Sequence, residues 1–124
     1  MTEILYKDLS YVLNGIFFDV YNTIGYGKRE KAYCQAIIKA LYNNKIKFLY
    51  QFKVPLIYHE HKIGNRYADF FIDDKIIVEI KVGKTTSSDF NQIKEYLNVS
   101  GLKLGLLVAF KKEEVKIYRV LNLY

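Results

Sequence analysis

The segment Tyr67–Val82, YADFFIDDKIIVEIKV, decides the fold of this 124-residue chain. It contains two strand-like runs, Arg66–Asp73 and Lys75–Val82, with the acidic pair Asp73-Asp74 between them as a tight turn. The second run is almost continuously apolar, which is typical of a strand buried on both faces. The segment therefore predicts a hairpin whose second strand lies in the middle of a sheet.

Three charged side chains interrupt this apolar hairpin. Glu79 and Lys81 share one face of the second strand, and pairing about the turn brings Asp69 within two residues of Glu79. Two carboxylates on neighbouring strands repel each other unless a cation lies between them. A hard divalent ion such as Mg²⁺ suits oxygen ligands, and Lys81 would then hold an anion or polarise a water molecule beside it. For the strand alone, a solvated face carrying a cross-strand ion pair is the alternative.

The rest of the chain predicts helices and further strands around this hairpin. The periodicity of apolar residues indicates helices over Asp8–Ile24, about Lys28–Asn43 and Ser88–Val99, and strands over Phe48–His61, Lys103–Phe110 and Val115–Leu121. Phe48–His61 is either one long strand or a bent pair, with Pro55 at an edge or a bulge, and Gly64-Asn65 is expected to form the next turn. Thr86–Asp89 fits a capping box that opens the third helix. The strands on either side of that helix are expected to be parallel, which gives an α/β fold with a mixed sheet.

Composition narrows the classes of protein to consider. A chain of 124 residues with 51% hydrophobic residues is expected to form a single domain over 1–124. Its one cysteine, Cys34, excludes an internal disulfide and favours a reducing, cytoplasmic setting. No apolar run approaches the roughly 18 residues of a membrane helix, so no membrane partner is expected. The net charge of +6 favours a polyanionic partner.

Two polar residues on the predicted helices are further candidates for a site. Glu30 is in phase with the apolar stripe of the second helix, although a first-turn Glu that complements the helix dipole is the common alternative. Gln92 and Tyr96 share one face of the third helix, where surface polar residues are more frequent than site residues.

The histidines and the cysteine predict no site of their own. His59 and His61 flank Glu60 and are expected on one exposed strand face, and their spacing is not that of a helical zinc motif. Cys34 lies in an apolar stripe with no evident base beside it, which indicates a small core residue.

Five stretches of the chain carry a resemblance to a known family. In chain order they are Gly27–Tyr33 (GKREKAY), Asp69, Glu79-Ile80-Lys81, Gln92–Leu97 (QIKEYL) and Gly101–Leu107 (GLKLGLL). Together they resemble the GxxExxY family of the PD-(D/E)XK nuclease superfamily over about residues 9–122. The chain has Ala68 where the superfamily has a proline before the aspartate.

The resemblance implies both a fold and a set of site residues. The fold is a restriction-endonuclease-like αβββαβ core, here with an additional N-terminal helix and a C-terminal edge strand. Asp69 and Glu79 would be metal ligands together with the Ile80 carbonyl, and Glu30 would complete the acidic site. Lys81 would steady the attacking water and the phosphate charge. Gln92 would orient groups from the far side of the site. The implied cofactor is Mg²⁺, with Mn²⁺ as a substitute.

The function expected from these residues is metal-dependent hydrolysis of phosphodiester bonds in nucleic acid, with DNA favoured over RNA and both left open. Endonuclease and exonuclease action both stay open. A chain of this size presents one site, so cutting both strands together would require a homodimer. The alternatives are a catalytically silent nucleic-acid-binding or protein-interaction module on the same fold, and a purely structural ion pair.

Overall fold

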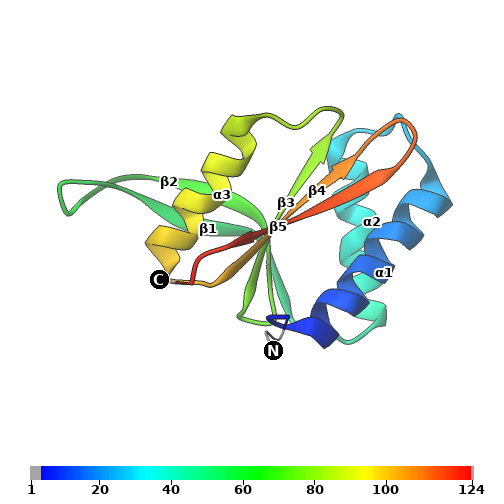
Figure 1. The fold of residues 1–124 in the computed structure, drawn as a ribbon, viewed down its shortest axis with the longest axis horizontal. Helices are drawn as coiled ribbons and strands as arrows, with labels where there is room; N and C mark the ends of the chain where they lie inside the picture. Colours follow the sequence, from blue (N-terminus) through cyan, green and yellow to red (C-terminus); the bar gives the residue numbers. More distant parts are fainter. Residues whose placement is uncertain (1–3, 124) are drawn as a thin grey trace.

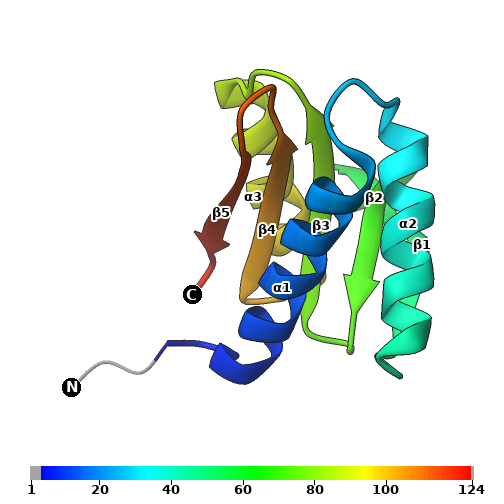
Figure 2. The same ribbon diagram turned by 90° about the vertical axis from the view of Figure 1, so that its right-hand side faces the viewer.

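The protein is a five-stranded mixed sheet between two layers of helices. The computed structural model describes residues 4–123. Its elements in chain order are α1 (Lys7–Ile24), α2 (Glu30–Asn43), β1 (Phe48–Tyr58), β2 (His61–Ile72), β3 (Ile76–Val82), α3 (Ser87–Ser100), β4 (Leu104–Phe110) and β5 (Val115–Leu121). α1 and α2 cover one face of the sheet and α3 covers the other (Figures 1 and 2). Among residues 4–123, no helix is both long and apolar enough to cross a membrane.

The sheet has the order β1-β2-β3-β4-β5, so β3 is central as its apolar sequence predicts. β3 and β4 are parallel and joined through α3, and the other neighbouring strands are antiparallel. Side chains of β3 alternate between two cores. Ile76 and Val78 pack with α1 and α2, whereas Ile77 packs with α3. The αβββαβ order, the extra N-terminal helix and the C-terminal edge strand expected from the sequence are all confirmed.

The turn between β1 and β2 differs from the sequence expectation. Gly64-Asn65 lies within β2, opposite Leu56 and Pro55, and the chain reverses at His59-Glu60 instead. The register set by the apolar inner parts of the two strands continues outward, and a bulge shifts it by one residue near Leu56. The turn therefore falls on His59 and Glu60, which take left-handed φ values of 46° and 67°. As a result the prediction that His59 and His61 share one strand face is wrong.

Other element boundaries are close to those expected. The turn at Asp73-Asp74 is confirmed, with positive φ at both residues. The capping box is present, since the side chain of Thr86 accepts from the Asp89 amide and that of Asp89 accepts from the Thr86 amide. α2 begins at Glu30 rather than at Lys28, because Arg29 is still extended with φ −72° and ψ 154°.

Gly105 gives a direct test of how tightly α3 packs on the sheet. A Cβ at this position of β4 would lie 2.4 Å from the Ile93 side chain on α3. We expect Gly105→Ala to destabilise the protein by about 1–3 kcal/mol, because the helix must shift to relieve the overlap. The free energy of unfolding in urea measures the effect.

Gly15→Ala on α1 is the matched control, since a Cβ there meets nothing within 4 Å. In this exposed helical position alanine is expected to stabilise by about 0.5–1 kcal/mol. Equal stabilities for the two variants would contradict the close packing of α3 on β4.

Candidate active site

The site begins where β2 and β3 separate. The two strands pair only at Phe70–Ile72, opposite Ile76–Val78. At the next position the main-chain ladder is replaced by two hydrogen bonds from amides to carboxylates. The Asp69 amide donates to Oε1 of Glu79 at 3.0 Å, and the Ile80 amide donates to Oδ2 of Asp69 at 2.7 Å. We name this pair of bonds between Asp69 and Glu79–Ile80 the carboxylate clasp.

The clasp leaves main-chain acceptors open at the edge of β3. In an extended strand the amide and the carbonyl of one residue point to the same edge. Because the Ile80 amide reaches Asp69 on the β2 side, the Ile80 carbonyl also points to that side, where β2 has moved away. The Ile80 carbonyl therefore lies on the β2 side, and Ile80 is one of the residues that line the first hollow.

The predicted site residues lie around two adjoining hollows. The first has a volume of about 210 Å³ and is lined by Glu30, Glu79, Ile80, Lys81, Asp89, Gln92 and Leu107. The second has a volume of about 410 Å³ and is lined by Glu30, Lys31, Cys34, Tyr50, Gln51 and Asp69. Glu30 borders both. Both hollows lie at one end of the sheet, where the C-terminal end of β3 meets the N-terminal ends of α2 and α3 (Figures 1 and 2).

The three acids of the site disfavour one another's charge. Burial, the neighbouring Asp69 carboxylate and Glu30 raise the pKa of Glu79 from 4.5 to about 8, against the lowering effect of the Asp69 amide. Burial also raises the pKa of Asp69, and the hydrogen bond from the Ile80 amide opposes that rise. Burial and the Asp69 charge raise the pKa of Glu30, whereas Lys81 lowers it. Three carboxyl groups with raised pKa values mark a place that gains from a cation.

Lys81 is held at the rim of the first hollow by the start of α3. Its Nζ lies 3.7 Å from Oδ1 of Asp89, while Oδ2 of Asp89 accepts the Thr86 amide at 2.8 Å. The Lys81 side chain is 40% exposed, so this ion pair is weak and can exchange for another anion. Asp89 is the residue that sequence analysis missed. Its capping role was visible in the sequence, but nothing there indicated that its second oxygen faces Lys81.

Gln92 enters the first hollow from the next turn of α3. Its Nε2 donates to the hydroxyl of Tyr96 at 2.5 Å, one turn further along the helix. This bond uses one of the two N–H donors of the amide, so the carbonyl oxygen and the second N–H of Gln92 are left for a ligand. Tyr96 is buried and belongs to the core cluster under α3, so it fixes the orientation of Gln92.

Glu30 is positioned by the loop before α2. The Tyr33 hydroxyl donates to the Gly25 carbonyl at 2.7 Å, and the Tyr33 ring stacks on Phe110 with centroids 4.2 Å apart. This tyrosine therefore ties the loop between α1 and α2 to the sheet. Glu30 itself is the first residue of α2, in phase with the buried residues Tyr33 and Ile37, and its partly exposed side chain lines both hollows.

The residues present fit a hard divalent cation. Within residues 4–123, no three side chains among His, Cys, Asp and Glu are already arranged as a ligand set. Asp69 and Glu79 nevertheless each use one oxygen in the clasp and keep the other. Mg²⁺ in proteins is commonly held by one or two carboxylates, with water and substrate oxygens completing its shell. A two-carboxylate site with raised pKa values matches that pattern.

The element order and the split between β2 and β3 define a restriction-endonuclease-like fold. A family model of the PD-(D/E)XK nuclease superfamily matches residues 7–120, so the chain belongs to this superfamily. An alkaline exonuclease from Laribacter hongkongensis is similar in structure, with a TM-score of 0.54 at 13% identity over 98% of this chain and 72% of that chain. The crystal structure of SSO0001 is similar with a TM-score of 0.52 at 11% identity over 94% of this chain and 78% of that chain. No curated protein matches the sequence.

The raised pKa of Glu79 predicts how stability depends on pH without divalent cations. The folded pKa of about 8 lies above the ordinary value of 4.5, so the folded state holds a proton that the unfolded state has lost. Stability is therefore expected to be greatest near pH 5 and to fall as the pH rises to about 8. Glu79→Gln stays uncharged and keeps an acceptor for the Asp69 amide, so its melting temperature should fall less over this interval.

Melting temperatures from pH 5 to pH 9 in EDTA test this dependence. Asp74→Asn, in the exposed turn before β3, is the matched control and should retain the wild-type slope. The same slope in wild type and in Glu79→Gln would contradict the role given to Glu79.

Proposed function

We propose that this protein hydrolyses phosphodiester bonds in DNA and depends on Mg²⁺ for that activity, with Mn²⁺ as a substitute. The observation that carries the proposal is the carboxylate clasp, because it joins two repelling acids across two adjoining hollows, with Glu79 and Lys81 in the first and Asp69 in the second. Close carboxylates that raise one another's pKa values lower the stability of the fold when no cation lies between them. Such a cost is expected at a functional site. Membership of the nuclease superfamily supports the same conclusion.

Asp69 and Glu79 would hold the ion, with the Ile80 carbonyl as a further oxygen and Glu30 completing the acidic site from α2. The chemistry that a divalent cation supplies when bound is Lewis-acid polarisation of a phosphoryl oxygen and a lower pKa for a water molecule. The clasp contributes by fixing the carboxylates through main-chain amides, so that they do not rotate away from the hollow.

Lys81 would offset the negative charge that develops on the phosphate and steady the attacking water. Asp89 keeps the Lys81 ammonium at the rim of the first hollow until a phosphate replaces the Asp89 carboxylate as the partner of Lys81. Gln92, oriented by Tyr96, would accept a hydrogen bond from the water or from the sugar. Asp89 and Tyr96 are positioning residues in this account, whereas Lys81 and Gln92 are catalytic residues.

The partner we propose is DNA, since the net charge of +6 suits a polyanionic backbone and the superfamily is one of nucleases. Cleavage of both strands of a duplex would need a homodimer, since one chain carries one such site. A panel of single-stranded, duplex and branched DNA and RNA, with Mg²⁺ or Mn²⁺, identifies the preferred substrate.

Asp69→Asn and Lys81→Ala test the catalytic site. Each is expected to reduce Mg²⁺-dependent cleavage by about 100-fold or more, because one removes a ligand charge and the other removes the cation facing the phosphate. The asparagine side chain retains an acceptor for the Ile80 amide, so the circular dichroism spectrum of Asp69→Asn should match that of wild type. Cleavage rates on the preferred substrate give the comparison.

Asp74→Asn and Lys94→Ala make the same changes of charge at exposed positions in a turn and on α3. They should cleave like wild type. Undiminished cleavage by Asp69→Asn or by Lys81→Ala would exclude this site.

Calorimetric titration separates the proposal from its alternatives. We expect Mg²⁺ and Mn²⁺ to bind the wild type at pH 8 and to bind Glu79→Gln at least tenfold more weakly, because a ligand charge is lost. No heat of binding with wild type would favour a structural ion pair. DNA binding that is indifferent to Mg²⁺, with no cleavage, would favour a silent binding module.

A further inference from the structure

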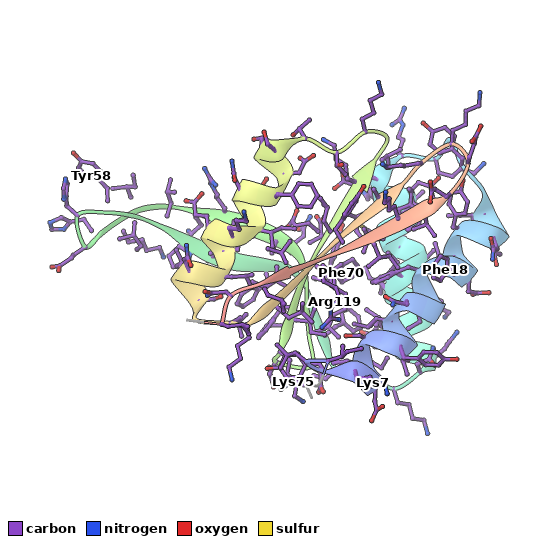
Figure 3. All side chains as sticks on the ribbon, in the orientation of Figure 1. Lys7, Phe18, Tyr58, Phe70, Lys75 and Arg119 are labelled. Atoms are coloured by element: carbon purple, nitrogen blue, oxygen red, sulfur yellow. The ribbon has the colours of Figure 1, made fainter. Side chains whose placement is uncertain are left out.

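The outer part of the β1–β2 hairpin projects beyond the sheet. Over Phe48–Tyr50 and Phe70–Ile72, β1 and β2 are part of the five-stranded sheet. From Phe52 to Ala68 the two strands pair only with each other (Figure 1). Tyr58 marks the far end of the projection in Figure 3. The six residue steps from Phe52 to Tyr58 extend about 20 Å at 3.3 Å per residue. We call residues 52–68 the projecting hairpin.

One face of the projecting hairpin is fixed to α3. Phe52, Val54 and Ala68 pack in the same core cluster as the apolar residues of that helix. Arg66 adds an ion pair to Glu95 of α3 at 2.7 Å. The hairpin is therefore held in one orientation and can meet a partner without first being ordered.

The opposite face is basic and apolar in alternation. Lys53 lies directly opposite Tyr67, and Ile57 lies directly opposite Lys62. Tyr67 and Ile57 are 53% and 46% exposed, and both lysines are exposed. No acidic residue lies on this face among residues 53–67, because Glu60 is in the turn. Lysines interleaved with exposed aromatic and aliphatic side chains suit a phosphate backbone with its sugars and bases.

The tip adds features that a merely structural hairpin does not need. Tyr58 is 61% exposed, and the bulge leaves Ile63, also 61% exposed, without a partner on β1. Apolar side chains this exposed at the end of a ribbon are available to a partner.

We propose that the projecting hairpin is a nucleic-acid-binding ribbon that holds the substrate duplex beside the cleavage site. This deepens the proposed function and rests on it. The hairpin adjoins Asp69, so a strand whose phosphate lies at the carboxylate clasp is close to the hairpin. A two-stranded ribbon also fits the major groove, which is about 12 Å wide. The lysines contact phosphates, and Ile57 and Tyr67 on the same face contact the sugars and bases.

The double variant Lys53→Ala/Lys62→Ala tests the ribbon. Fluorescence anisotropy with a labelled 20-base-pair duplex, in EDTA so that nothing is cleaved, measures the dissociation constant at several salt concentrations. We expect affinity to fall about tenfold or more at low salt. The slope of log K against log [salt] should become less steep by about 1.8, for two lost phosphate contacts.

Lys7→Ala/Lys39→Ala is the matched control, since it removes the same charge from α1 and α2. Lys7 lies far from Tyr58 at the hairpin tip (Figure 3). The control variant should retain wild-type affinity and salt slope. Equal losses in the two double variants would overturn the proposal, because net charge alone would then explain binding.

Two further measurements complete the test. Mg²⁺-dependent hydrolysis of bis(4-nitrophenyl) phosphate, too small to reach the hairpin, should stay within twofold of wild type in Lys53→Ala/Lys62→Ala. If the wild type hydrolyses no phosphodiester but the hairpin variant still loses duplex affinity, the proposed activity fails and the ribbon stands. A variant that binds the duplex like wild type but changes its oligomeric state by light scattering would instead assign the hairpin to a protein interface.

Discussion

The exchange of main-chain hydrogen bonds for amide–carboxylate bonds at Asp69 and Glu79 is the interaction on which the rest of the structure depends. A continuous ladder there would keep β2 against β3 and close the edge of the central strand. With the clasp in its place, the strands part. The parting opens the Ile80 carbonyl, makes room for the ends of α2 and α3, and frees the outer hairpin. One local irregularity thus creates both the acidic hollow and the projection beside it.

The fold tolerates this irregularity because the strands behind it are well buried. All seven residues of β4 are buried, and they pair with β3 along its whole length. The repulsion between the carboxylates is therefore confined to one end of the sheet, whereas the other end is buried and paired strand to strand. Lys81 is the cation that lines the first hollow, and its partner Asp89 keeps it at the rim. Stability and chemistry are consequently separated along the length of β3, with apolar packing at its start and charge at its end.

Sequence reasoning succeeded where geometry is local. The face shared by Glu79 and Lys81 follows from strand alternation, and the approach of Asp69 follows from a short turn at Asp73-Asp74. It failed at the longer hairpin, because the two strands pair beyond Gly64-Asn65 and a bulge at Ile63 of β2 shifts their register by one residue, so the turn falls at His59-Glu60. It also missed the part played by Asp89, since a capping residue with one oxygen to spare looks like any other capping residue. What a side chain meets from a distant element is decided by packing, which periodicity alone does not describe.

The short span between the two central acids also bears on the order in which the chain folds. Asp69 and Glu79 are ten residues apart and are joined by a tight turn, so bringing them together closes a small loop. Glu30 joins from 39 residues before Asp69, and the helix carrying Gln92 joins only after a crossover. Contacts that are near in sequence form early in folding. The growing chain therefore meets the repulsion of its own acidic pair before the helices that enclose it have docked. The proton or cation that relieves this repulsion is expected to act on the rate of folding as well as on the final stability.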